Sequence, residues 1–302
     1  MAYTTIDNPT LHFQNKIYSG NGSTQSITFD QTNTNMQPDW VWVKCRNDGK
    51  HHSLYDSVRG VTKYLISNRT DAEQTNSGGV TSFDSNGFSV GNFGDVNGSF
   101  NFVSWNWKAG NSSGSSNGDG SITSTVSANT TAGFSIVSYT GNGSAGATIG
   151  HGLGAVPKWV IIKRRDTTEG WQIFHTSLGN TKYIELNSNA APVTASTLWN
   201  DTSPSSSVVT LGTSTRVNAN SSTYIAYCFA EKQGYSKFES FTGNGNADGT
   251  FIYTGFKPAW ILIKDTGSTQ SWFMYDNKRD TINPNTKLLT VNNNSAEEDS
   301  AS

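Results

Sequence analysis

The sequence predicts an all-β fold built from tandem antiparallel β-sandwich (jelly-roll-like) repeats, with two full units and a partial third. The first observation is a motif that occurs three times, an aromatic residue, Ser or Thr, and then Gly-Asn-Gly, beginning at Tyr18, Tyr139 and Phe241. The second is a Trp that follows each motif after 22, 20 and 19 residues and opens an apolar run ending in Lys. The third is that short apolar runs alternate with Gly, Asn, Ser and Pro turns, and no window has helical periodicity. Such self-similarity indicates a repeat architecture.

Composition places the chain among folded β-proteins and excludes several functional classes. Of the 302 residues, 34% are apolar and only 15% are charged, while 12% are aromatic and the formal net charge is −2. A disordered chain would lack the aromatic residues, and a nucleic-acid-binding protein would carry a basic field. No apolar run is long enough to span a bilayer, and Met1–Asp7 has neither the basic nor the apolar region of a signal peptide. We therefore expect no nucleic-acid partner and no membrane insertion.

The repeats divide the chain into five segments. Unit one closes with an aromatic run at 102–107, and unit two closes with the matching run at 224–230. Asn86-Gly87 predicts a hairpin turn within 83–90, and the Gly/Ser/Asn-rich linker is flexible by composition, with room for an extra strand at 122–126. The predicted boundaries are 1–15 for an N-terminal lead-in, 16–110 for unit one, 111–131 for the linker, 132–234 for unit two and 235–302 for the partial unit three.

Unit three has no counterpart of the aromatic closing strand. Its Thr-Lys-Leu-Leu stretch lies at 286–289, and residues 295–302 are acidic and polar. The sequence leaves two alternatives open: the unit is truncated, or another copy or a partner completes its sheet. An open sheet edge invites such pairing. Because unit three begins directly at Tyr235 without a linker, we also expect units two and three to pack tightly.

The strands that open with Trp are apolar on both faces. In unit two, positions 159 and 161 face one side and positions 160 and 162 face the other, and all four are apolar. Such a strand is predicted to lie in the middle of a sandwich or beneath a neighbouring unit. The Lys that ends each run is expected where the strand emerges into water.

No catalytic or metal-binding constellation rises above background. Gly141–Gly146 matches G-x-G-x-x-G, but the next residues do not start a helix, so a β-turn is favoured over a dinucleotide site. The five histidines lack zinc-ligand spacing and are interpreted as surface or turn residues. Asp119 and Asp248 lie in Gly/Asn turns without a complete calcium loop, and Cys45 and Cys228 are expected to be buried free thiols. We predict no enzymatic activity, no cofactor and no metal.

The tryptophans form two groups. Trp40, Trp159 and Trp260 recur at one position in all three units, which favours a core role. A sugar-stacking platform would want exposed rings near loops. Trp171, Trp199 and Trp272 lie nearer loops and are the better candidates for surface or glycan contact, although packing is the commoner role for such residues.

The repeated motifs resemble a known family. The motif at 139–143, the run Gly-His-Gly-Leu-Gly-x-x-Pro-Lys-Trp-Val-Ile-Ile-Lys at 150–163, and Tyr-Ile-Ala-Tyr-Cys-Phe-Ala-Glu-Lys-Gln-Gly-Tyr-Ser-Lys-Phe at 224–238 are similar to repeated β-domains of virion-associated, tail-fibre-like structural proteins of marine bacteriophages. Asp-Ser-Val-Arg-Gly at 56–60 fits the same family. The resemblance covers nearly the whole chain and implies a component of the phage particle.

The expected function is therefore that of a bacteriophage virion structural protein, with a tail fibre or host-contact appendage first. The alternatives are a capsid decoration or head-fibre protein and, from another class, a carbohydrate-binding module. The expected partners are other virion proteins, further copies of the chain (a homotrimer, by analogy with fibres), and a host surface glycan or protein. The expected location is the exterior of the phage particle, after synthesis in the host cytoplasm.

Overall fold

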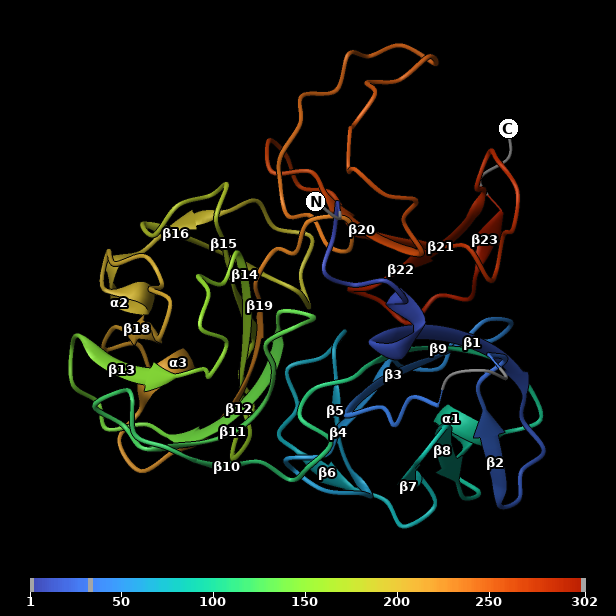
Figure 1. Cartoon of the computed structure of the whole chain (residues 1–302), viewed down its shortest axis with the longest axis horizontal. Coiled ribbons are helices and arrows are strands. Elements are labelled where there is room, and N and C mark those ends of the chain that lie inside the picture. The colour runs from blue at the N-terminus through green and yellow to red at the C-terminus, as the bar shows by residue number, and fades with distance from the viewer. Residues whose placement is uncertain (1–2, 32–34, 300–302) are drawn as a thin grey trace.

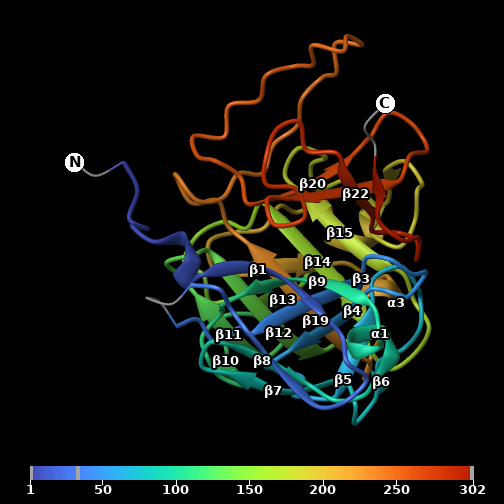
Figure 2. The same ribbon diagram turned by 90° about the vertical axis from the view of Figure 1, so that its right-hand side faces the viewer.

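The all-β prediction is confirmed by the structure, a computed structural model that describes residues 3–31 and 35–299 (Figure 1). Three larger antiparallel sheets surround a shared interior, and two smaller sheets cover the outer faces of the first and second of them. The view in Figure 2 shows the third sheet lying across the ends of the other two. Helices in the described residues are single turns, and none could cross a bilayer.

The first sheet has the order β1-β9-β3-β4-β5-β6. Its strands are β1 (Phe13–Ser19), β3 (Trp40–Cys45), β4 (Ser53–Asp56), β5 (Lys63–Ile66), β6 (Gln74–Thr75) and β9 (Asn101–Trp107). The sheet that covers it has the order β2-β8-β7, with β2 (Gln25–Thr28), β7 (Val80–Asp84) and β8 (Gly87–Val90). The predicted hairpin is confirmed between β7 and β8. Its turn needs glycine, because Gly87 has φ 135° and a Cβ there would lie 2.0 Å from the Ile27 carbonyl oxygen.

The second sheet has the order β10-β11-β12-β19-β14-β15-β16-β17. Its strands are β10 (Ser115–Asn117), β11 (Ser124–Asn129), β12 (Phe134–Thr140), β14 (Trp159–Arg164), β15 (Trp171–His175), β16 (Lys182–Glu185), β17 (Val193–Thr194) and β19 (Thr223–Phe229). Its cover is the pair β13 (Ala147–Gly150) and β18 (Val208–Leu211). The stretch expected to be a flexible linker contributes β10 and β11, because these strands extend the second sheet at its edge and gain backbone partners there.

The third sheet has the order β20-β21-β22-β23, with β20 (Trp260–Lys264), β21 (Trp272–Asp276), β22 (Lys287–Thr290) and β23 (Glu298–Asp299). This order matches β3-β4-β5-β6 and β14-β15-β16-β17, and the Trp that opens each first strand pairs with Asp56, His175 or Asp276. In the first two sheets an aromatic strand, β9 or β19, pairs with the other edge of that Trp strand. Among the described residues, β20 has no such neighbour.

Within residues 3–31 and 35–299, four short helices interrupt the strands: η1 (Pro9–Leu11), α1 (Gly94–Asn97), α2 (Ser196–Trp199) and α3 (Thr215–Asn218). They carry no long amphipathic pattern, so sequence periodicity does not reveal them. In α3 the Ser214 hydroxyl caps the turn by accepting from the Arg216 amide at 3.3 Å.

Each Trp strand of the first two sheets is buried on both faces, as its two-sided apolar pattern predicts. One face packs with the covering sheet, and the other packs into an interior shared by all three large sheets. Trp40 and Trp159 are buried in this shared interior, so their predicted core role is confirmed, while Trp260 is half-buried at its border. Cys45 and Cys228 are buried and unpaired, as predicted.

Candidate functional site

One hydrogen bond, repeated three times, joins the large sheets in a closed ring. The donors are ring nitrogens at equivalent places: His52, directly before β4, and Trp171 and Trp272, the first residues of β15 and β21. Each contacts the carbonyl oxygen of the last residue of β5, or of its equivalents β16 and β22, in another sheet. The distances are 3.1 Å from His52 Nε2 to Thr290 O, 2.9 Å from Trp171 Nε1 to Ile66 O and 2.9 Å from Trp272 Nε1 to Glu185 O. The first sheet therefore bonds to the third, the third to the second, and the second to the first.

His52 takes part in this ring as a neutral donor. The Thr290 carbonyl can only accept, so the proton lies on Nε2, and Nδ1 accepts from Trp42 Nε1 at 2.9 Å. Complete burial holds the pKa of His52 well below its usual value, which favours this neutral form. The imidazole thus supplies the same N–H that the two indoles supply elsewhere.

The three tryptophans proposed for glycan contact are all interior residues. Trp171 and Trp272 are buried between sheets in the ring described above. Trp199 is buried in α2 under the second sheet, and its Nε1 donates to Lys182 O at 3.0 Å. None of the three rings is exposed as glycan contact would require, and each packs in the interior, the commoner role, because a neighbouring sheet or layer covers the indole.

The lysines that end the Trp strands also bridge the sheets. Lys44 and Lys163 are fully buried, so the expectation that these lysines emerge into water is wrong for both. Their Nζ atoms donate across the sheet boundary to Asn294 O at 3.4 Å and Thr70 O at 3.2 Å. Lys264, more exposed, reaches Asn189 O at 3.3 Å. Desolvation lowers the pKa of Lys44 and of Lys163 to about 8.

Ion pairs reinforce two of the three boundaries between sheets. Arg165, beyond β14, holds Glu73 with two bonds of 2.9 and 3.0 Å, and Arg46, beyond β3, holds Glu297 with bonds of 2.9 and 2.8 Å. The amide of each Glu also donates to the carbonyl of its Arg. Arg165 lies two residues after Lys163, and Glu73 lies three residues after Thr70, whose carbonyl Lys163 contacts. At the boundary between the second and third sheets, the same offsets from Lys264 and Asn189 lead to Thr266 and Pro192. Neither can form the ion pair, and Pro192 lacks the amide N–H.

A second network, of buried Asp–Arg pairs, is also present in the first and third sheets and replaced in the second. Asp56 and Arg59 pair fully buried, and the Tyr227 hydroxyl of β19 donates to Asp56 at 2.7 Å. Asp276 and Arg279 repeat this arrangement in the third sheet, where Trp105 of β9 donates its indole N–H to Asp276 at 3.0 Å.

In the second sheet, His175 and Leu178 take the places of Asp and Arg. Both face a groove instead of an aromatic closing strand. Burial lowers the pKa of His175, so this position carries no buried charge near neutral pH.

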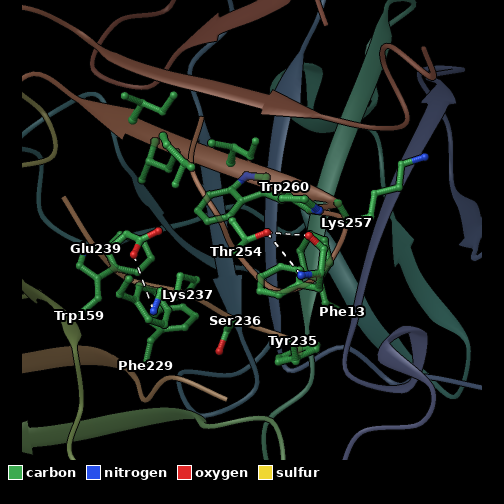
Figure 3. Close-up of a pocket in the computed structure, with 18 of the residues that line it drawn as sticks. Phe13, Trp159, Phe229, Tyr235, Ser236, Lys237, Glu239, Thr254, Lys257 and Trp260 are labelled. Atoms are coloured by element: carbon green, nitrogen blue, oxygen red, sulfur yellow. Dashed lines mark hydrogen bonds and ion pairs between the residues drawn. The ribbon is translucent and has the colours of Figure 1, made fainter. Parts of the chain in front are cut away.

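This groove is the candidate functional site (Figure 3). It has a volume of about 1580 Å³ and lies between the second sheet, β20 and the segment 234–257. Its walls are mostly aromatic and aliphatic, with Trp159, Phe229 and Trp260 among the residues labelled in the close-up. Trp159 and Trp260 have ring centroids 6.3 Å apart. Units two and three, expected to pack tightly, touch through Trp159 and Trp260, but an apolar opening remains beside this contact.

The segment beside the groove exposes large apolar side chains. Residues 243–256 extend away from the sheets as the orange loop in Figure 1. Phe251 is 85% exposed and Tyr253 is 70% exposed. Exposed aromatic residues next to an apolar opening are a common feature of surfaces that bind other molecules.

The polar groups of the groove do not form a catalytic arrangement. Lys237 bridges Glu231 and Glu239 at 3.4 and 3.7 Å, and these are solvent-screened pairs. Within residues 3–31 and 35–299, no group of three or more His, Cys, Asp or Glu side chains could hold a metal ion. The groove therefore supplies contact area and strand edges, and these suit binding.

Two other sequence interpretations can be compared with the structure. Gly141–Gly146 precedes β13 and starts no helix, as expected of a turn, and Gly143 and Gly146 have φ of 73° and 76°. The interpretation of the histidines as surface or turn residues is wrong for His52, which is fully buried at a sheet boundary, whereas His151 is buried but belongs to a turn. His151 accepts from the Leu153 amide at 3.2 Å and contacts Ser205 O, so it closes a local turn.

A family model described as Domain of unknown function (DUF7483) matches residues 8–302. The chain therefore belongs to this family. Comparison with curated proteins and with solved structures found no match.

Proposed function

We propose that this member of the DUF7483 family is a structural component of a bacteriophage particle, a tail fibre or other host-contact appendage. The observation that carries the proposal is the apolar groove beside the third sheet, because its walls offer a surface for binding another protein and no arrangement for chemistry. The phage assignment is supported by the repeated motifs at 139–163 and 224–238, which resemble virion-associated proteins. We propose a location on the exterior of the particle, with other virion proteins and further copies of the chain, as a homotrimer, as partners.

A capsid decoration protein remains the second candidate within the same class, since the groove serves either position. The carbohydrate-binding alternative has lost the residues proposed for it, because Trp171, Trp199 and Trp272 are buried. Exposed Phe251 and Tyr253 would have to replace them as a stacking surface.

The test is the position of the chain in an intact particle. Antibodies raised against the full chain would be gold-labelled and imaged on purified phage, and free protein would be tested as a competitor of phage adsorption. Label at the tail with blocked adsorption supports the fibre assignment. Label spread with capsid symmetry supports decoration, and a chain missing from purified particles overturns the proposal.

A further inference from the structure

The first two sheets show what normally lies beside a Trp strand. The amide of Asp39, one residue before β3, donates to the carbonyl of Trp107, the last residue of β9, at 2.8 Å. The amide of Lys158, one residue before β14, donates in the same way to Phe229, the last residue of β19, at 2.7 Å. The counterpart before β20 is Ala259. Among the described residues its amide has no acceptor.

The other end of each aromatic strand also accepts a backbone hydrogen bond, from an amide just beyond the Trp strand. Arg46 N donates to Asn101 O at 2.7 Å, and Arg165 N donates to Thr223 O at 2.8 Å. These carbonyls belong to the first residues of β9 and β19. The counterpart in the third sheet is Thr266, and no acceptor for its amide lies in the part of the chain that the structure describes. The two free amides therefore stand at the two ends of a site for one antiparallel strand of seven residues, the length of both β9 and β19.

The side of this site opposite β20 also has a segment that could pair with an inserted strand. In the first two sheets the aromatic strand lies between the Trp strand and β1 or β12. Residues 237–242 correspond to β1 and β12, since the repeated Gly-Asn-Gly motif follows all three, yet they are in no strand. The segment has the sequence of an edge strand and has no neighbour to pair with. A strand placed in the groove would have a backbone partner on each side.

We infer that the groove binds a β-strand of a partner polypeptide, which inserts between β20 and residues 237–242 and pairs antiparallel with β20. Strand addition of this kind gains affinity from backbone hydrogen bonds and specificity from pockets for alternate side chains. Both aromatic strands of the described residues already fill this position in their own sheets, and the same holds in every copy of the chain, so neither supplies the occupant. The inference stands on the strand edges of the third sheet and does not depend on the proposed function.

The groove also defines the side chains of the occupant. In β9 and β19, the residues that face the shared interior are Val103, Trp105, Trp107, Ile225, Tyr227 and Phe229. The corresponding face of the groove contains Trp159, Trp260 and Leu262. Trp105 and Tyr227 each donate to a buried carboxylate, but the groove presents His175 and Leu178 at that place. The occupant therefore carries large apolar or aromatic residues at alternate positions. The middle one of its three inward-facing residues, the counterpart of Trp105 and Tyr227, needs no hydrogen-bond donor.

The test uses two labelled peptides based on residues 223–229 and the full chain. In the first peptide, Tyr224→Ser, Ala226→Ser and Cys228→Ser keep the three residues that face the interior. In the second, Ile225→Ser, Tyr227→Ser and Phe229→Ser keep the other face. Fluorescence anisotropy measures binding, and amide hydrogen exchange of the protein locates it. The first peptide should bind at least about 100-fold more tightly, because it buries three large apolar side chains, and should slow exchange at Ala259 and Thr266.

Variants of the protein sharpen the result. Leu262→Lys places a charge on the groove face of β20 and should weaken the first peptide at least about tenfold. Ile282→Ser changes an exposed apolar residue outside the groove and should leave binding unchanged. Equal binding of the two peptides, no binding of either, or protection elsewhere than β20 would overturn the inference. So would slow exchange of Ala259 and Thr266 in a self-associated chain without peptide, since a second copy would then be the occupant.

Discussion

The boundary between the first and second sheets and the boundary between the second and third sheets share one plan and differ in their ion pairs. Both contain an indole donating to a β-strand carbonyl, from Trp171 in one and Trp272 in the other. Only the first contains the Arg165–Glu73 pair and the buried Asp56–Arg59 pair. The indole bonds are thus common to these two boundaries, while the ion pairs accompany a closing strand.

The difference has a physical reason. A buried carboxylate is tolerated when a cation and further donors satisfy it, and losing one partner leaves an unpaired charge in the interior. Asp56 has Arg59 and the Tyr227 hydroxyl. The second sheet faces the groove with neutral His175 and Leu178 instead, so it needs no donor from a strand within the described residues. Among the described residues, the ion pairs of these two boundaries lie at the one where a closing strand of the same chain is present.

The largest expected effect breaks the charged boundary. Arg59→Met leaves Asp56 buried without its cation and should lower the free energy of unfolding by about 3–5 kcal/mol, measured by urea denaturation. The matched substitution Leu178→Met, at the groove, conserves volume and should cost less than about 1.5 kcal/mol. Similar losses in the two variants would show that the boundaries do not differ as described.

The shared indole bonds should be worth similar amounts at both boundaries. Trp171→Phe leaves the Ile66 carbonyl without its donor and should cost about 1–3 kcal/mol of unfolding free energy. Trp272→Phe should cost an amount within about 1 kcal/mol of this, for the same reason. Thermal or urea unfolding of both variants gives the comparison, and a large excess at Trp171 would contradict the shared plan.

The lysines give the two boundaries different pH dependence. The pKa of Lys163 is about 8 in the folded protein against 10.5 for an ordinary lysine, so the unfolded chain binds more protons between these values. Stability should therefore rise with pH from 8 to 10, by roughly 1–2 kcal/mol per buried lysine. Urea midpoints across this range should rise less in Lys163→Met. Lys264→Met, at the more exposed lysine, should change the slope little; an unchanged slope in Lys163→Met would refute the assignment.

The smallest effect would come from adding an ion pair to the boundary between the second and third sheets. The pair Thr266→Arg with Pro192→Glu copies Arg165 and Glu73 and restores the amide that Pro192 lacks. Being half-exposed, the new ion pair should add about 0.5–1 kcal/mol to the unfolding free energy. Each single substitution is the control and should add less than the pair. Additive single effects would mean that the two side chains do not meet.

The sequence predicts the strands well because their signals are local. The continuous apolar run of β14 and the Asn86-Gly87 turn each determine a strand or turn within a few residues. It also identifies the open edge of the third unit, since the missing aromatic run is visible as a gap in the repeat. The burial of Lys163 and Trp171 could not be predicted, because it depends on residues about 100 positions away in another sheet. A tryptophan beside a loop has the same sequence pattern whether sugar or protein covers it.

The closed set of three hydrogen bonds from His52, Trp171 and Trp272 has a consequence for which substitutions the protein can accept. In a homotrimer one substitution alters three symmetric contacts together. Here the three donors are separate positions of a single polypeptide, so each can mutate alone. His52 stands in the place that indoles occupy at 171 and 272, and it makes the same bond with different chemistry.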